Sequence, residues 1–189
     1  TELTRNEQFA GGANLFVTPF EGAELRVSFL TLQEYRRGGD QLDLPPHEAA
    51  IAEEIQTTRV QGDIRFEHKV SELLTYHIGY VSAFTDRRSY YGGGGDIEPS
   101  APGLGEPVDQ AYLEDVEAEQ VALGGYGRTR NPMNVADAHV DLTYDALGPQ
   151  VLTLGAQANI DDVTDRYLGY DRVIDDTFTV LGAYAQHDW

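Results

Sequence analysis

The chain has 189 residues, a net charge of −19 and no cysteine. The negative charge argues against nucleic acid or an anionic membrane surface as a partner, because both would repel it. The lack of cysteine excludes a disulfide framework, a thiolate metal site and a cysteine nucleophile. The length suits one domain.

Alternation of polar and apolar residues predicts β-strands, because successive side chains of a strand point to opposite faces. The first two strands are predicted at residues 8–18 and 24–36, with a short turn at 19–23. A loop at about 37–54 follows, marked by paired glycines and prolines.

The clearest alternation belongs to the next predicted strand, residues 55–70. Between residues 59 and 70 the odd positions are charged or amide residues, while the even positions include Val60, Ile64 and Phe66. Soluble strands usually have about 5–6 residues, whereas a tilted strand that crosses a bilayer needs about 9–11. The length therefore favours a membrane strand, and no apolar run reaches the roughly 18 residues of a membrane helix.

The rest of the chain continues the same arrangement of strands and connections. Long loops are predicted at about 91–132 and 162–176, and short turns at 70–73 and 146–149. The remaining predicted strands are residues 74–90, 134–145, 150–161 and 177–189.

Short and long connections alternate, so the short ones fall at one end of the sheet and the long ones at the other. Outer-membrane barrels have this asymmetry, with short periplasmic turns and long extracellular loops. No charged residue lies mid-strand on the apolar side, where Arg or Lys would cost about 2–4 kcal/mol in lipid. We therefore predict an all-β fold, an antiparallel up-and-down meander of about seven long strands within a larger transmembrane β-barrel. An antiparallel sheet that covers a soluble core is the alternative.

Several strand-to-loop joints resemble the barrel of TonB-dependent outer-membrane receptors. The likeness spans nearly the whole chain and includes no catalytic or ligand-reading signature. It is carried by Glu34-Tyr35-Arg36-Arg37-Gly38-Gly39-Asp40, Leu44-Pro45-Pro46-His47-Glu48-Ala49, Ile51-Ala52-Glu53, Thr85-Asp86-Arg87-Arg88-Ser89-Tyr90-Tyr91-Gly92-Gly93, Asp162-Val163-Thr164-Asp165-Arg166-Tyr167 and Leu181-Gly182-Ala183-Tyr184-Ala185-Gln186-His187-Asp188-Trp189.

The resemblance implies that residues 1–189 form a partial barrel domain in the cell outer membrane. The family's plug domain and TonB-binding motif are not visible in the sequence, and about seven strands cannot close a barrel, so we expect an interior fragment. The implied function is TonB-dependent uptake of a scarce solute: an iron-siderophore, haem, cobalamin or a glycan. The implied partners are outer-membrane lipid, a small solute such as a metal chelate, and the TonB complex through the missing plug domain.

The resemblance also assigns expected roles to two sets of residues. Polar residues facing the lumen or the plug would be Arg26, Glu34, Arg59, Asp63, Arg65, Glu67, Asp137, His139, Asp141 and Gln157. Loop residues lining an outer ligand vestibule would be His47, Tyr91, Tyr112 and Tyr126.

Local motifs do not indicate catalysis. His47-Glu48-Ala49-Ala50-Ile51 lacks the second histidine of a zinc-protease helix. The acidic loop residues do not match a calcium-loop spacing and are better explained as a solvated loop. We expect no enzyme activity, resident cofactor or metal site. A soluble β-rich module that binds Ca²⁺ or glycan, and an outer-membrane barrel hydrolase, are the other functions considered.

Overall fold

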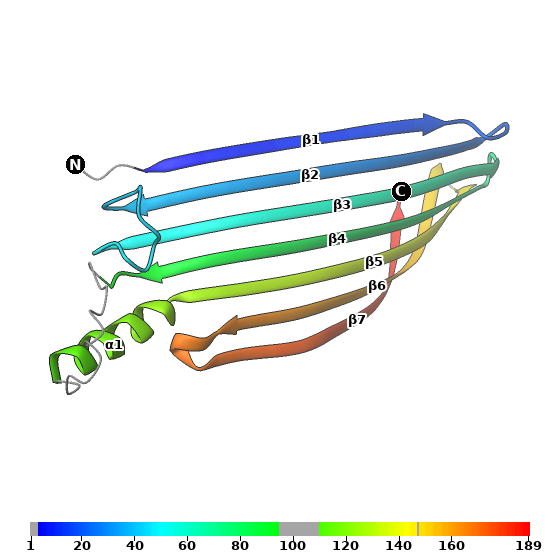
Figure 1. The fold of residues 1–189 in the computed structure, drawn as a ribbon. Coiled ribbons are helices and arrows are strands. Elements are labelled where there is room, and N and C mark those ends of the chain that lie inside the picture. Colours follow the sequence, from blue (N-terminus) through cyan, green and yellow to red (C-terminus); the bar gives the residue numbers. More distant parts are fainter. Residues whose placement is uncertain (1–3, 95–109, 147) are drawn as a thin grey trace.

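The computed structural model describes residues 4–94, 110–146 and 148–189. Within these residues, seven antiparallel strands pair in chain order to form one sheet (Figure 1). The predicted all-β, up-and-down meander is therefore confirmed. The strands are β1 (Arg5–Val17), β2 (Ala23–Gly39), β3 (Ala52–Ser71), β4 (Leu74–Gly92), β5 (Tyr126–Asp145), β6 (Pro149–Tyr167) and β7 (Arg172–Asp188).

The predicted separation of short and long connections holds for five of the six. The exception is the β6–β7 connection, residues 168–171, which is shorter than the β1–β2 turn, residues 18–22. The turns β1–β2, β3–β4 and β5–β6 lie at one end, and the other three connections lie at the opposite end (Figure 1). The first turn contains Gly22 at φ +77°, a backbone conformation that glycine adopts without steric cost. We call the two ends the short-turn end and the long-loop end.

The strands extend further than the alternation predicts, so the predicted loops 37–54, 91–132 and 162–176 differ from the observed connections. Strand β5 already begins at Tyr126, and β7 begins at Arg172. The segment predicted as the longest loop also contains a helix, α1 (Gln110–Leu123), while residues 95–109 lie outside the described residues. A short 3₁₀ turn, η1 (Leu168–Tyr170), joins β6 to β7.

Polar pairing explains why these strands continue beyond the alternating segments. Pro132 ends the predicted loop, because residues 91–132 show no alternation. Proline also cannot donate to a strand ladder. In the structure the neighbouring Asn131 side chain donates to the Asp162 carbonyl at 2.9 Å, so β5 and β6 remain joined there. Between β6 and β7, the Thr177 hydroxyl donates to the Asp162 carboxylate at 2.6 Å.

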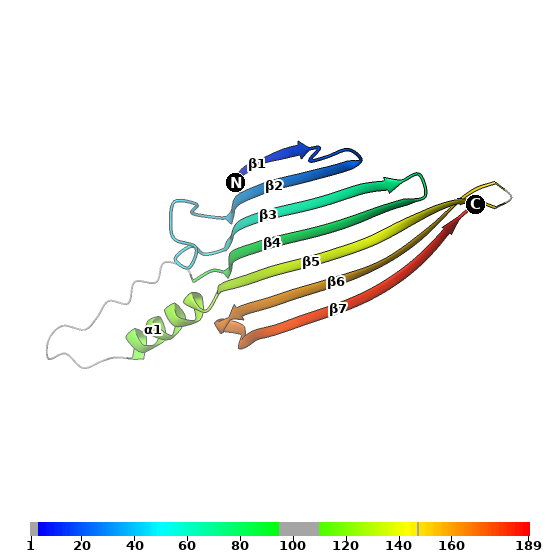
Figure 2. The ribbon, with the colours of Figure 1, turned by 90° about the vertical axis from the view of Figure 1, so that its right-hand side faces the viewer.

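Helix α1 is explained by composition. Its sequence consists largely of Ala, Glu, Gln and Leu, which have high helix propensity, and contains neither glycine nor proline. Most of its residues are exposed, and Ala122 is buried. The helix projects beyond the long-loop end of the sheet (Figure 2). In the described part of the chain, no helix is long and apolar enough to span a membrane.

The sheet is a single curved layer (Figures 1 and 2). Among the described residues, the buried apolar cluster consists of Ala49, Ala52 and Tyr90 at the long-loop end. The strands themselves enclose no comparable core. Burial therefore does not account for the apolar residues on the middle of the sheet.

Those apolar residues share one face, because the pairing register aligns them in rows across all strands. One row consists of Leu15, Val27, Ile64, Tyr80, Ala136, Ala158 and Leu181. We call the half of this face nearest the short turns the apolar band. In β4 it extends from Tyr76 to Phe84, comparable to the roughly 9–11 residues of a bilayer-crossing strand.

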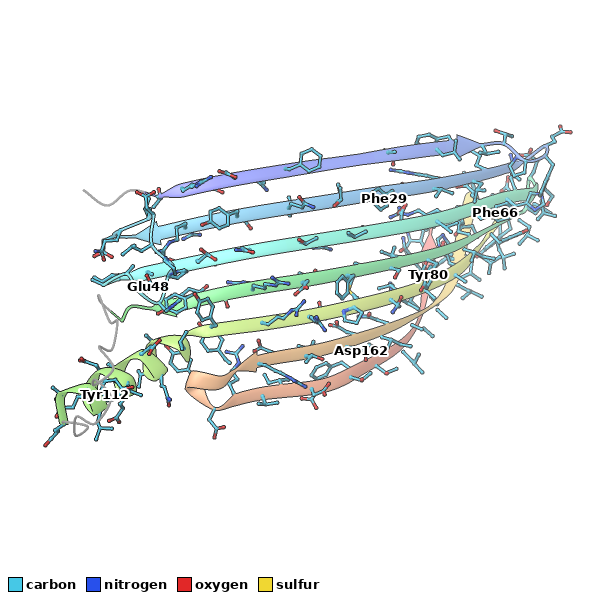
Figure 3. All side chains as sticks on the ribbon, viewed as in Figure 1. Phe29, Glu48, Phe66, Tyr80, Tyr112 and Asp162 are labelled. Atoms are coloured by element: carbon cyan, nitrogen blue, oxygen red, sulfur yellow. The ribbon has the colours of Figure 1, made fainter. Side chains whose placement is uncertain are left out.

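The apolar band is exposed. Ile64 is 49% exposed, Leu154 41% and Phe29 48%. Figure 3 shows Phe29, Phe66 and Tyr80 on this part of the sheet. Among the described residues, neither a second sheet nor a helix covers it. Soluble monomers rarely expose large contiguous apolar patches, and such patches usually mark an interaction surface.

Candidate functional site

The face opposite the apolar band carries most of the charged side chains, together with the exposed apolar residues Phe16, Leu30 and Val180, and we call it the polar face. All ten residues predicted to face the lumen or plug lie on it in the observed register: Arg26, Glu34, Arg59, Asp63, Arg65, Glu67, Asp137, His139, Asp141 and Gln157. They are brought together because each occupies the polar phase of its strand. The register places them on one surface and does not identify what that surface faces.

Charged pairs organise the middle of the polar face. Asp63 is 9% exposed, and Arg65 donates to its carboxylate at 3.1 Å. Arg59 donates to the Gln61 side chain at 3.1 Å. Burying a carboxylate is costly unless a partner compensates for the lost hydration, and Arg65 provides such a partner for Asp63 Oδ2.

A recess of about 900 Å³ lies on this face near the short-turn end. Six of the predicted residues line it: Arg26, Arg65, Glu67, Asp137, His139 and Gln157. His77, which the predicted set omitted, lines it as well. The recess therefore mixes positive, negative and imidazole groups on an otherwise flat sheet.

The densest group of ionisable side chains in this region is His77, His139 and Asp141. His77 and His139 are directly paired across β4 and β5, and their rings stack with centroids 4.2 Å apart. His77 Nε2 lies 3.1 Å from Asp141 Oδ2. One donor atom from each of the three residues lies within 4.8 Å of the others. We call these residues the His-His-Asp cluster.

Three further side chains orient this cluster. Glu67 Oε2 lies 3.4 Å from His77 Nδ1, and Asp137 Oδ1 lies 3.4 Å from His139 Nδ1. Thr153 donates its hydroxyl proton to Asp141 Oδ1 at 2.6 Å. Each cluster residue thus has one polar atom next to an outer neighbour, while His77 Nε2 and Asp141 Oδ2 contact each other.

The predicted vestibule residues do not form one site. His47 and Tyr126 do meet: His47 Nδ1 lies 2.9 Å from the Tyr126 hydroxyl. Tyr126 also packs against the buried Tyr90, with ring centroids 4.7 Å apart. This group lies at the long-loop end of the face that carries the apolar band.

Tyr91 lies on the opposite side of the sheet from this group. It lines a recess of about 440 Å³ together with Arg87, Asp165, Tyr167 and Arg172, among others. Arg87 donates to the Tyr91 hydroxyl at 2.9 Å. Tyr112 lies on α1, beyond the end of the sheet (Figure 3), and so is separate from both groups.

Sequence reasoning missed two features, of which one depends on the strand register and the other on the loop after β2. His77 lies in the polar phase of its strand, but nothing local shows that it pairs with His139. Arg37 is 1% exposed and donates to the Leu44 carbonyl at 3.4 Å, because the loop after β2 folds over it. The sequence signal for the first feature was available: both histidines occupy the polar phase of consecutive strands.

Comparison with known proteins provides no relative from which a role could be transferred. No protein-family model, no curated protein and no solved structure matches the chain.

Proposed function

We propose that this chain forms part of the wall of an outer-membrane β-barrel that serves as a TonB-dependent receptor for a scarce solute. The observation that carries the proposal is the exposed apolar band, which crosses all seven strands in register. Hydrocarbon tails would cover this band without requiring a second protein layer. The polar face opposite it suits the water-filled interior of such a barrel.

The arrangement of charge supports the same placement. On the apolar face the first charged side chain of β4 beyond the band is Asp86, which accepts two hydrogen bonds from Arg128 at 2.9 and 2.5 Å. This pair lies toward the long-loop end, where a strand would leave the hydrocarbon region. Tyr76 and Tyr144 lie at the opposite margin of the band, and aromatic residues are typical of both membrane interfaces.

Within the part of the chain that the structure describes, β1 and β7 each have an unpaired edge, and this supports the idea of a partial wall. Lipid cannot satisfy the backbone groups of an open sheet edge, so further strands would have to pair with both edges. The solute class proposed is an iron-siderophore, haem, cobalamin or glycan, with energy supplied through a plug domain and the TonB complex. No resident cofactor or enzymatic step is part of the proposal.

The membrane placement can be tested by adding one positive charge to either face of the same strand. Ile64→Arg adds it to the apolar band, and Thr57→Arg adds it to the polar face, directly opposite Glu34. In lipid we expect Ile64→Arg to lower the free energy of unfolding by about 2–4 kcal/mol. Thr57→Arg should change it by no more than about 0.5 kcal/mol, as for an ordinary surface substitution.

The measurement is urea unfolding of the protein folded into phosphatidylcholine vesicles. Equal effects of the two substitutions would count against lipid contact at Ile64. The uptake role needs a separate assay: cells lacking the protein should accumulate less of one labelled solute from the four proposed classes, and a protonophore should abolish the difference. Normal accumulation of all four would refute the receptor role while leaving the membrane placement intact.

A further inference from the structure

We propose that the His-His-Asp cluster binds a divalent transition-metal ion of the zinc class on the polar face. The cluster consists of His77 from β4 and His139 and Asp141 from β5. This inference needs only the folded sheet. It depends neither on contact with lipid nor on solute uptake.

The donor set determines the class of metal. Two imidazole nitrogens and one carboxylate oxygen suit zinc and neighbouring first-row ions. Ca²⁺ and Mg²⁺ prefer sites built entirely from oxygen ligands. The chain has no cysteine, so the selectivity of the site does not involve thiolate ligands.

The residues around the cluster are arranged like the outer hydrogen-bond partners of known metal ligands. Metal-binding histidines usually donate their second ring N–H to a carboxylate or carbonyl, which fixes the ring and increases its basicity. Glu67 lies 3.4 Å from His77 Nδ1 and Asp137 lies 3.4 Å from His139 Nδ1. Both arrangements leave Nε2 as the metal-binding nitrogen.

The Asp141 carboxylate also has an outer hydrogen-bond partner. The Thr153 hydroxyl donates to Asp141 Oδ1 at 2.6 Å, while Asp141 Oδ2 lies 3.1 Å from His77 Nε2. Asp141 Oδ2 thus contacts His77 Nε2 directly. A metal ion would replace this contact by coordinating both atoms.

One local change is needed for coordination. The two rings now stack at an interplanar angle of 16°, so their nitrogen lone pairs run nearly parallel. Coordination would require a rotation about χ2, a torsion with a broad energy well in histidine, to bring both Nε2 atoms to one point. The side chains of Glu67 and Asp137 would have to follow their rings to keep the contacts with Nδ1. The bound metal ion would thus cross-link β4 and β5 without a movement of the backbone. At least one coordination position of the ion would stay open.

The experiment titrates the full chain, folded in detergent micelles, with ZnCl₂ and separately with CoCl₂. We expect saturable binding of one ion per chain, and visible Co²⁺ absorption without a thiolate charge-transfer band. Equal concentrations of Ca²⁺ or Mg²⁺ should not displace Zn²⁺. Absence of saturable Zn²⁺ binding by the folded protein would overturn the proposal.

Variants locate the site. His77→Gln and His139→Gln should each abolish binding, and Glu67→Gln, which removes an orienting partner, should weaken it about 10–100-fold. The control is His187→Gln, a histidine outside the cluster, which should bind as tightly as the unmodified protein. Far-UV circular dichroism checks that each variant is folded.

Unchanged binding by His77→Gln and His139→Gln, or equal loss in His187→Gln, would refute the site. If His77→Gln fails to fold, Glu67→Gln decides the question. Because binding is measured in micelles, its failure would leave the vesicle experiment on Ile64 unaffected, and the converse also holds.

Discussion

At the long-loop end, the side chain of Asp165 in β6 contacts residues of both neighbouring strands. It is 3% exposed, accepts a hydrogen bond from the Thr129 hydroxyl at 2.8 Å, and forms an ion pair with Arg172. One carboxylate of β6 therefore joins β5 and β7. Leaving a buried carboxylate without its charged partner lowers the free energy of unfolding. Water reduces this effect here, because the Arg172 side chain is 58% exposed and the ion pair is partly screened.

We expect Asp165→Asn to lower the free energy of unfolding by about 1–3 kcal/mol, because it weakens hydrogen bonds that involve a charged group. The measurement is urea unfolding of the protein in detergent micelles. Asp175→Asn is the matched control. Its carboxylate is exposed and accepts one long hydrogen bond from Thr164 at 3.4 Å, so its effect should stay within about 0.5 kcal/mol. A larger loss in the control would show that Asp165 has no special role.

Among the structural elements, the β1–β2 turn depends on the backbone of one glycine. Gly22 has φ +77°, and its carbonyl accepts a hydrogen bond from the Lys69 N–H at 2.8 Å. A Cβ atom at Gly22 would lie 2.6 Å from the Lys69 carbonyl oxygen. The turn thus fixes how β1 and β2 dock against the end of β3.

Gly22→Ala should destabilise the sheet by at least about 1–2 kcal/mol, the usual cost of a left-handed conformation for a residue with a side chain, because the steric contact adds to it. Gly182→Ala is the control, since open space surrounds that position in β7. The readout is the rate of hydrogen exchange of the backbone amides in all seven strands. Faster exchange should be confined to β1 and β2 in the first variant and absent in the second. Equal exchange in both variants would contradict the argument.

At the scale of the whole molecule, the described residues form a single sheet with two unpaired edges and one exposed apolar band. This combination predicts how the chain behaves in water. Without detergent or lipid we expect the chain to self-associate, because both the edges and the band would be solvated at a cost. In micelles it should be monodisperse. Analytical ultracentrifugation under the two conditions makes the comparison. A monodisperse, cooperatively folding monomer in plain buffer would refute the membrane placement and favour a soluble β-rich module.

A second measurement tests the two faces at the same level. Trp189 is the only tryptophan, so Trp189→Phe provides a silent background. In that background, Tyr80→Trp on the apolar band should be quenched by brominated lipid, while Val81→Trp on the polar face should not. Equal quenching at both positions would show that lipid does not distinguish the faces.

Side-chain alternation alone predicted the all-β meander and the phase of the polar residues, because a strand repeats every two residues and every neighbour reveals its face. Helix α1 and the continuation of β5 through Pro132 escaped prediction, since both depend on energies that alternation does not encode. Helix propensity favours α1, and a side-chain hydrogen bond from Asn131 keeps β5 and β6 joined beside Pro132. The contact between His77 and Asp141, 64 positions apart in the chain, required the pairing of β4 with β5. Register is set by the sheet as a whole, so no local stretch of residues specifies which side chains meet across it.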